Sequence, residues 1–260
     1  MTSLRWRLMV LGSFAVSIVK TALRAPLVYR NWIYFLWSRF SDREGILELR
    51  NGLRFWIRPH STDRAAITEV LVLGSYSEVP QGSVVLDVGA NIGAFSLAAS
   101  RRAAVVYALE PVRNNFEMLR RNIELNKASN IVAERLAMAG ENGECEMSVA
   151  GVFSSMHFQA ANAEVEKVRT VTLESFLDER GISQLDYLKM DCEGAEWDIV
   201  LQAPPDVLAR IKHIEMEFHN IDARTSPRFL QEHLSLAGFQ STFSEGERFN
   251  GALVATRQPI

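Results

Sequence analysis

The sequence contains, at residues 84–93, the stretch Val84-Val85-Leu86-Asp87-Val88-Gly89-Ala90-Asn91-Ile92-Gly93. Its first half, apolar apart from Asp87, is typical of a strand that is buried on both faces of a parallel sheet. Gly89 and Gly93 allow a tight turn and a close approach of the backbone to a ligand. A helix after such a turn begins with N–H groups that have no partner within the helix. The stretch therefore predicts a strand, a ligand-binding turn and a helix.

The same alternation continues along the chain. Strands are expected over 104–109, 131–136, 185–190 and 211–218, and helices over 92–101, 114–126, 195–202 and 226–237. Two short strands over 239–243 and 252–255 are expected to pair antiparallel around a turn near Gly246. This order predicts right-handed crossovers and an α/β fold, a doubly wound and mostly parallel sheet with helices on both faces.

Two further segments do not follow the alternation. Residues 46–57 hold two apolar runs around Asn51-Gly52, the strongest short signal for a β-hairpin, and a helix is expected from Asp63 to Leu73. Residues 144–171 alternate in short runs and indicate an inserted hairpin region. We expect an N-terminal basic and aromatic helical extension over 1–45 and a main domain over 46–260. Within that domain the hairpin and helix of 46–80 precede a core at 81–260.

The composition is that of an ordinary globular protein. The chain has 260 residues, 48% of them hydrophobic, and a formal net charge of -3, which argues against general nucleic-acid binding through phosphate neutralisation. Cys145 and Cys192 lie far apart and belong to no Cys/His cluster, so neither a zinc site nor a disulfide framework is expected. A reducing compartment such as the cytoplasm is the simplest interpretation.

The first 40 residues differ from the rest because all their formal charges are positive: Arg5, Arg7, Lys20, Arg24, Arg30 and Arg39. The apolar run from Leu8 to Val19 is shorter than the roughly 20 residues that a membrane-spanning helix needs. Basic residues beside Trp32, Tyr34 and Trp37 fit helices that lie on an anionic membrane surface. Packing against the main domain or a second copy, and a signal or anchor segment, are the alternatives.

Acidic residues follow the first two expected strands of the core. Asp87 suits a cationic ligand better than a pyrophosphate, and the turn after it lacks the GxGxxG pattern of dinucleotide-binding folds. Glu110, in Leu109-Glu110-Pro111, stands where a carboxylate can accept hydrogen bonds from both hydroxyls of a ribose. Together the two ends predict a nucleoside ligand.

These motifs resemble a known family. Residues 85–93 resemble motif I of class I methyltransferases, and Leu109-Glu110-Pro111 resembles their second motif. Residues 187–196, Tyr-Leu-Lys-Met-Asp-Cys-Glu-Gly-Ala-Glu, resemble the signature of FkbM-type methyltransferases. The resemblance covers roughly residues 63–256. It implies a seven-stranded sheet with an antiparallel last strand, S-adenosylmethionine as the methyl donor and usually O-methylation of sugars or natural products.

The resemblance also implies where the donor binds. Asp87, Gly89 and Asn91 would line its methionine end, Glu110 would hold the ribose with help from Asn115, and Ala137 would lie near the adenine. The full set expected to contact the cofactor is Asp87, Gly89, Ala90, Asn91, Gly93, Glu110, Pro111, Asn115, Ala137 and Asp191.

The reacting end is expected after the last two parallel strands. Asp191, Glu193 and Glu196 crowd three carboxylates into six residues, which raises the pKa of at least one of them. Alternation places Glu215, Glu217 and His219 on one face of a strand. The residues expected to act in catalysis are His219 as general base, Asp191 as its runner-up and Glu217. Glu193 and Glu196 are expected to bind the acceptor.

Several alternatives stay open at this site. His219 is equally well explained as a capping or solvated residue, and His157 of the inserted region is a second candidate to reach the site. Residues 153–156 are candidates for an acceptor wall, although apolar core is the more frequent role. Asp191, Glu217 and His219 could hold a divalent metal, but their spacing matches no recognised motif, and no metal is expected.

The function that follows is S-adenosylmethionine-dependent O-methylation of a hydroxyl on a sugar, a lipid-linked glycan or a natural product. The expected partners are a small-molecule or lipid-linked acceptor, a cytoplasmic membrane face contacted through residues 1–40, and a second copy of the chain. A nicotinamide-dependent oxidoreductase and a non-catalytic nucleoside-binding domain are the rival hypotheses. The missing GxGxxG and the late carboxylate cluster argue against the first, and fold alone never excludes the second.

Overall fold

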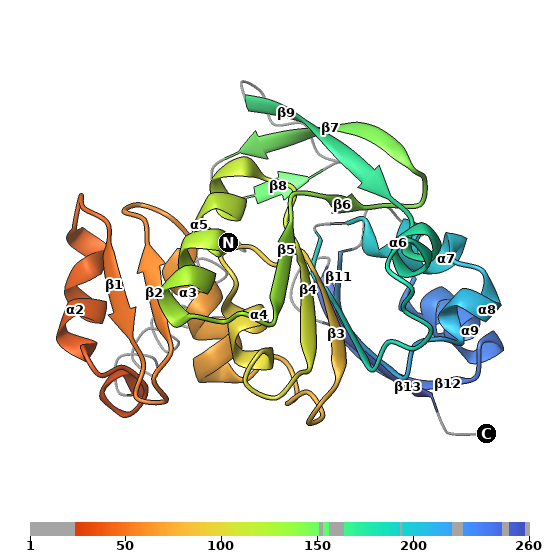
Figure 1. Cartoon of the computed structure of the whole chain (residues 1–260), viewed down its shortest axis with the longest axis horizontal. Helices are drawn as coiled ribbons and strands as arrows, with labels where there is room; N and C mark the ends of the chain where they lie inside the picture. The colour runs from red at the N-terminus through yellow and green to blue at the C-terminus, as the bar shows by residue number, and fades with distance from the viewer. Residues whose placement is uncertain are drawn as a thin grey trace, which may run out of the picture. The chain divides into compact units, whose positions relative to one another are not determined.

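The computed structural model describes residues 24–150, 153–155, 164–192, 194–219, 226–245 and 250–257 (Figure 1). The chain divides into two compact units, residues 1–75 and residues 76–260. The hairpin of residues 46–57 and the helix after it lie in the first unit. The Asp87 and Glu110 motifs and the residues 187–196 signature all lie in the second unit.

The first unit contains the expected hairpin. Strands β1 (Gly45–Glu48) and β2 (Arg54–Ile57) pair antiparallel. Gly52 adopts a φ of 93°, which the turn requires, and the side chain of Asn51 accepts a hydrogen bond of 3.0 Å from the backbone N–H of Leu53. The hairpin prediction is therefore confirmed.

A helix follows the hairpin, as the sequence predicts. It begins as α3 (Asp63–Thr68) and continues as the π-helical turn η2 (Glu69–Leu73). Gly74 ends it with a left-handed φ of 72°, the usual role of glycine after a helix. The sequence located the helix, but its side-chain spacing gave no sign of the change to π-helical hydrogen bonding in the last turn.

One side of helix α2 (Trp32–Trp37) packs on the hairpin. Asn31, just before the helix, donates a hydrogen bond of 2.8 Å to the carbonyl of Ile46, and the rings of Tyr29 and Phe35 stack with centroids 4.3 Å apart. Residues 24–28 are helical and a 3-10 turn covers Ser38–Phe40. The apolar run from Leu8 to Val19 lies outside the described residues. Of the helices that the structure describes, none is long and apolar enough to span a membrane.

The second unit is built on a seven-stranded sheet with the order β12-β13-β11-β10-β3-β4-β5. The strands are β3 (Val84–Val88), β4 (Val105–Leu109), β5 (Ile131–Glu134), β10 (Tyr187–Met190), β11 (His213–His219), β12 (Phe239–Glu245) and β13 (Asn250–Arg257). Neighbours from β5 to β11 pair parallel, and β13 pairs antiparallel with both β11 and β12. The mostly parallel α/β sheet with an antiparallel last strand is confirmed.

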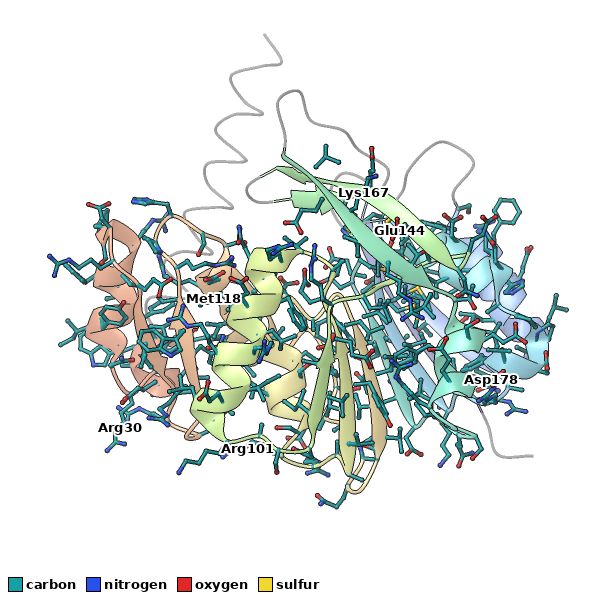
Figure 2. The ribbon with its side chains drawn as sticks, turned by 45° about the horizontal axis from the view of Figure 1, so that its top comes forward. Arg30, Arg101, Met118, Glu144, Lys167 and Asp178 are labelled. Carbon is teal, nitrogen blue, oxygen red and sulfur yellow. The ribbon has the colours of Figure 1, made fainter. Side chains whose placement is uncertain are left out.

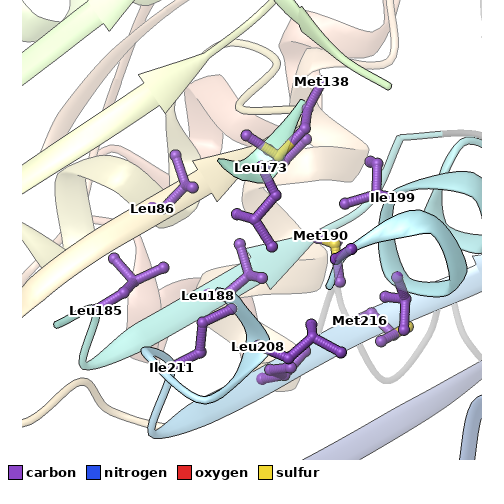
Figure 3. Packing of buried hydrophobic residues seen from close by; sticks show 14 of the residues in the cluster. Leu86, Met138, Leu173, Leu185, Leu188, Met190, Ile199, Leu208, Ile211 and Met216 are labelled. Atoms are coloured by element: carbon purple, nitrogen blue, oxygen red, sulfur yellow. The ribbon is translucent and has the colours of Figure 1, made fainter. Parts of the chain in front are cut away.

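Helices follow the strands as the alternation predicts. They are α4 (Ala94–Ala99), α5 (Arg113–Asn126), α6 (Leu173–Glu179), α7 (Glu196–Gln202), α8 (Pro205–Leu208) and α9 (Pro227–Leu236). The largest buried cluster joins strand residues such as Leu188 and Met216 to helix residues such as Ile199 (Figure 3). Pro227 occupies the first position of α9 as expected, but the side chain of Ser226 makes no capping hydrogen bond, contrary to its expected role.

Helices α6 and α8 were not predicted from the sequence. The N-terminus of α6 is marked by Thr172, whose hydroxyl accepts a hydrogen bond of 3.2 Å from the N–H of Ser175. Leu173, Phe176 and Leu177 follow at helical spacing and are all buried. This signal was readable in the sequence but stood next to the strand-like run of 164–171.

The inserted region forms a separate four-stranded sheet with the order β6-β9-β7-β8. Its strands are β6 (Ala137–Met138), β7 (Gly143–Ala150), β8 (Phe153–Ser155) and β9 (Glu164–Val171). Figure 2 shows Glu144 and Lys167 on its two long strands, which pair antiparallel. The inserted hairpin is confirmed, and β6 extends it, because the strand expected over 131–136 ends at Glu134 and the chain then joins the second sheet.

Candidate active site

Most of the predicted site residues lie at or just after the carboxyl ends of four strands that are neighbours in the sheet, β4, β3, β10 and β11. The four strands are parallel, so their carboxyl ends lie at one edge of the sheet. After β3 the chain adds β4 and β5 on one side of β3, and it later adds β10 on the opposite side of β3. The strand order therefore reverses between β3 and β10. Ligands of open α/β sheets bind at such a point.

The turn after β3 is shaped by three residues with positive φ: Gly89 at 78°, Asn91 at 51° and Gly93 at 91°. A Cβ added to Gly89 would lie 1.9 Å from the carbonyl oxygen of Asp191. The close approach that the sequence analysis assigned to a ligand is therefore made to the backbone after β10. Glycine at position 89 brings the turn after β3 and the residues after β10 into direct contact.

Asp87 is fully buried and has a cationic partner within the protein. Its Oδ1 lies 3.1 Å from Nζ of Lys189, an ionic contact without the angle of a hydrogen bond, and its Oδ2 accepts a hydrogen bond of 2.6 Å from Ser96. Lys189 also donates to the carbonyl of Gly89 at 2.8 Å. Burial alone lowers the pKa of Lys189, but the charges of Asp87 and Asp191 outweigh it and raise the pKa. The ammonium group thus holds the first turn of the site in place.

Glu110 connects the turns after β3 and β4. Its Oε2 accepts a hydrogen bond of 2.8 Å from the N–H of Asn91, and its Oε1 accepts one of 3.0 Å from the N–H of Val112. Burial raises the pKa of Glu110 to about 7, although these bonds, a hydrogen bond from Asn115 and the charge of Lys189 all act to lower it. The hydrogen bonds that Glu110 accepts within the protein therefore do not offset the effect of burial on its charged form.

The other residues predicted to contact the cofactor differ in their surroundings. Ala90 is buried and its N–H donates to the carbonyl of Leu109 at 2.9 Å, whereas the carbonyl of Pro111 accepts from Arg135 at 3.1 Å. Asn115 stands beside Glu110. Ala137 lies in β6, where its side chain packs with Met147 and Val168 in the core of the second sheet. Of this group, Asn115 is the residue whose side chain the structure brings to Glu110.

Glu196 supports the loop that follows β10. It is fully buried, with Oε1 accepting from the N–H of Cys192 at 2.8 Å and Oε2 accepting from the N–H of Gly194 at 2.9 Å. The sequence analysis expected Glu196 to bind the acceptor. In the structure each of its two oxygens accepts a hydrogen bond from a backbone amide of this loop, so both amides have a partner within the protein. Glu193 lies outside the described residues.

His219 ends β11 beside this loop. Its Nδ1 lies 3.3 Å from Oε1 of Glu196, and its Nε2 lies 3.8 Å from Oε1 of Glu217. A carboxylate only accepts hydrogen bonds, so the contact with Glu196 favours the tautomer with the proton on Nδ1 and a lone pair on Nε2. Burial, and then the charge of Glu196, raise the pKa of Asp191 against the opposing charges of Lys189 and His219. The predicted catalytic residues are therefore electrostatically linked.

Comparison with protein families matches residues 87–241, more than half of the chain, to the Methyltransferase FkbM domain. The chain belongs to the FkbM methyltransferase family. The matched range contains the turn after β3, Glu110, the inserted sheet, the residues 187–196 signature and His219. The family match therefore includes most of the residues predicted for the site.

Individual relatives of this chain are distant. It is 28% identical over 194 residues to the 31-O-demethyl-FK506 methyltransferase FkbM of Streptomyces tacrolimicus, covering 61% of this chain and 74% of that one. It is 26% identical over 217 residues to the AMB antimetabolite synthetase AmbE of Pseudomonas aeruginosa, covering 66% of this chain but only 10% of that protein. A crystal structure of methyltransferase FkbM from Methylobacillus flagellatus KT has a TM-score of 0.47 and 19% identity, covering 76% of this chain and 48% of that one.

The FkbM-family site also contains residues that the sequence analysis did not select. Lys189 was quoted within the signature but given no role, and Ser77 and Tyr76 were not considered. The ring of Tyr76 lies 5.6 Å from Nζ of Lys189. Ser77 donates to Glu215 through its N–H at 3.0 Å and also through its hydroxyl. Tyr76 and Ser77, which precede β3, thus contact residues of β10 and β11. No local pattern in the sequence indicates these contacts.

Glu215 has a structural role on the face that it was expected to share with Glu217 and His219. Although burial raises the pKa of Glu215, hydrogen bonds from His213 and Ser77 bring it down to about 2. Glu217 and His219 lie farther along β11 and keep partial exposure, as expected of the outermost residues. Among the side chains that the structure describes, no group of three or more His, Cys, Asp or Glu residues is arranged to hold a metal ion. His157 lies outside the described residues, and the side chains of residues 153–156 are not described.

Proposed function

We propose that the chain transfers a methyl group from S-adenosylmethionine to a hydroxyl oxygen of a sugar, a lipid-linked glycan or a natural product. Membership of the FkbM family supports methyl transfer and argues against the nicotinamide-dependent alternative. The name of the Streptomyces tacrolimicus relative, a 31-O-demethyl-FK506 methyltransferase, supports an oxygen target. The observation that carries the proposal here is the environment of Glu110.

The donor set around Glu110 fits a nucleoside. Two backbone N–H groups and Asn115 leave the pKa of this buried carboxyl at about 7, since they do not offset its burial. A carboxylate has about four lone-pair positions, so both oxygens can accept further hydrogen bonds. The two hydroxyls of a ribose would supply these donors and stabilise the charged form. Gly89, Asn91 and Gly93 would then shape the turn beside the methionine end of the ligand.

The bound donor would supply an electrophilic methyl group, and the protein must then remove the proton of the acceptor hydroxyl. His219 fits this task, because the contact of its Nδ1 with Glu196 favours a proton on Nδ1 and leaves the lone pair on Nε2, which lies 3.8 Å from Oε1 of Glu217. The two amides at Cys192 and Gly194 hold the carboxylate of Glu196 in turn. Glu196 is therefore a positioning residue in this proposal, and the acceptor oxygen contacts His219.

Asp191 is the second candidate for the base. Its backbone N–H donates to the carbonyl of Val88 at 3.0 Å, which fixes it at the edge of β3 and β10. Burial and neighbouring carboxylates raise the pKa of its side chain, so Asp191 binds a proton more readily than an exposed aspartate does. The two candidate bases can be distinguished through Glu196. His219 depends on Glu196 for its tautomer, whereas Asp191 does not.

Calorimetric titration of the full chain with S-adenosylhomocysteine, beside NAD, tests the donor. We expect micromolar binding of S-adenosylhomocysteine, no binding of NAD, and at least about tenfold weaker binding in Glu110→Ala, a loss of about 1.4 kcal/mol. Glu117→Ala, which changes an exposed glutamate of α5, is the matched control and should bind as the wild type does. Preference for NAD would refute the proposal. Unchanged binding in Glu110→Ala would refute the role of Glu110.

A further inference from the structure

Helix α2 presents an apolar face to solvent. Trp32, Ile33, Leu36 and Trp37 are exposed, with 66% of Ile33 and 57% of Trp37 accessible. At about 100° per residue these four positions span an arc of about 140°. Phe35 lies outside the arc and is buried, stacked on Tyr29. Among the residues that the structure describes, the helix therefore uses one side for the fold, and its more apolar side is exposed.

The apolar surface extends beyond α2. Leu27 before the helix is 76% exposed and Phe40 after it is 77% exposed. Six large apolar side chains are thus exposed within 14 residues of the chain, a concentration that is typical of an interaction site. We call the surface formed by Leu27, Trp32, Ile33, Leu36, Trp37 and Phe40 the α2 patch.

Beside the patch lies an open hollow of about 490 Å³, lined by Arg30, Asn31, Trp32, Ile33, Tyr34 and Trp37. Its lining combines a guanidinium group with two indole rings and contains no carboxylate. Arg30 is exposed, and Arg24 and Arg39 flank the patch on the chain. From residue 1 to residue 40 the sequence has six basic residues and no acidic one.

From these observations we infer that the α2 patch docks on an anionic lipid surface. Tryptophan and tyrosine favour the boundary between headgroups and acyl chains, and aliphatic side chains insert below it. Arginine side chains at the rim pair with lipid phosphates, each contributing about 1 kcal/mol near an anionic membrane. A second copy of the chain would place the same basic residues against each other, so the charge favours lipid. This inference is independent of the proposed reaction.

Flotation of the full chain with vesicles tests the inference. We expect it to float with phosphatidylcholine vesicles that contain phosphatidylglycerol and to remain in solution with phosphatidylcholine alone. Ile33→Ser/Trp37→Ser should reduce the floated fraction at least about tenfold, because two apolar anchors are removed. Arg30→Glu should reduce it at least about fivefold, the change that corresponds to one basic residue.

Exposed residues on α9 and α5 give the matched controls. Phe229→Ser/Leu236→Ser removes two side chains that are 55% and 82% exposed, and Arg120→Glu reverses an exposed charge on α5. Both variants should float as the wild type does, and all variants should keep the wild-type near-ultraviolet circular dichroism. Binding of S-adenosylhomocysteine in the α2 variants, unchanged from wild type, separates this test from that of the donor site.

Two results would overturn the inference. The first is equal flotation of the wild type and Ile33→Ser/Trp37→Ser. This result would mean that another surface binds the vesicles or, if neither protein floats, that the chain does not bind them. The second is a wild-type dimer that becomes a monomer in this double variant, measured by light scattering, without any phosphatidylglycerol-dependent flotation. That outcome would assign the α2 patch to an interface between two copies of the chain.

Discussion

The Nδ1 atom of His219 lies 3.3 Å from Oε1 of Glu196, the same oxygen that accepts the N–H of Cys192. One buried carboxylate therefore holds both the loop after β10 and the imidazole at the end of β11. The two elements carry Asp191 and His219, the two residues that we propose as candidates for the base. This relationship makes the behaviour of His219 the sharpest test of the proposed chemistry.

We expect His219→Ala to lower kcat about a hundredfold or more while binding S-adenosylhomocysteine normally, since a positioned general base contributes about that much. Single-turnover methyl transfer and calorimetry measure the two quantities. Glu217→Gln, which changes the carboxylate 3.8 Å from Nε2, is the comparison and should have a smaller effect. If His219→Ala retained full activity, Asp191 would become the leading candidate for the base.

The pKa of Glu110 predicts how cofactor affinity depends on pH. Ribose hydroxyls bind the charged carboxylate, so binding must remove the proton that a group with a pKa of about 7 holds in part at neutral pH. The affinity for S-adenosylhomocysteine should therefore fall as the pH drops below about 7, with proton release on binding. Calorimetry in buffers of different ionisation enthalpy measures the released protons. Glu110→Gln should remove this dependence.

The same carboxyl group predicts a trend in stability. Its folded pKa of about 7 exceeds the ordinary value of 4.5, so the favourable contribution of the protonated form is complete below pH 4.5 and is lost as the pH rises through 7. Wild type should lose stability relative to Glu110→Gln across that window. Urea denaturation of both proteins at pH 5 and pH 8 measures the difference. Parallel pH profiles of the two would contradict the raised pKa.

Gly89→Ala tests the contact between the turns after β3 and β10. The new Cβ would lie 1.9 Å from the carbonyl oxygen of Asp191, in addition to the strain of a positive φ of 78°. Gly82→Ala introduces a similar φ of 72° with no atom within 4 Å of the new Cβ. We expect Gly82→Ala to cost about 1 kcal/mol and Gly89→Ala at least about 2 kcal/mol more, with weaker cofactor binding only in the second.

Equal losses of stability in the two glycine variants would contradict the collision. Thermal and urea denaturation measure the loss, and calorimetry with S-adenosylhomocysteine measures the effect on the site. Because both glycines lie in the second unit, the two variants report on the same folding transition.

Lys189→Met tests the buried ion pair. The substitution leaves Asp87 fully buried without its cation, which costs about 3–5 kcal/mol in the free energy of unfolding. Lys189→Met/Asp87→Asn removes the uncompensated charge and should recover a large part of that loss. Urea denaturation of the single and double variants measures it. A double variant as unstable as Lys189→Met would show that packing, not charge, is the main contribution of Lys189.

The sequence determined the elements and their order. Apolar runs such as 84–88 predict buried strands, because a strand inside a parallel sheet is shielded from water on both faces. Asn51-Gly52 and Gly74 mark a turn and a helix end through backbone conformations that few residues other than glycine adopt. These signals are local, so the βαβ alternation, the antiparallel last pair and the inserted sheet could be predicted. The signature at 187–196 indicated the family for a related reason, its fixed spacing.

Only the tertiary structure decided the partners of the buried polar groups. Lys189 and Gly89 are 100 residues apart, and their contact arises from the register that pairs Lys189 with Asp87 across β3 and β10. The partners of Asp87, Gly89 and Glu196 within the protein could not be predicted, because a polar group near a strand end gives no local sign of its partner. A buried charge requires compensation within hydrogen-bonding distance, and which group provides it depends on how the strands are aligned.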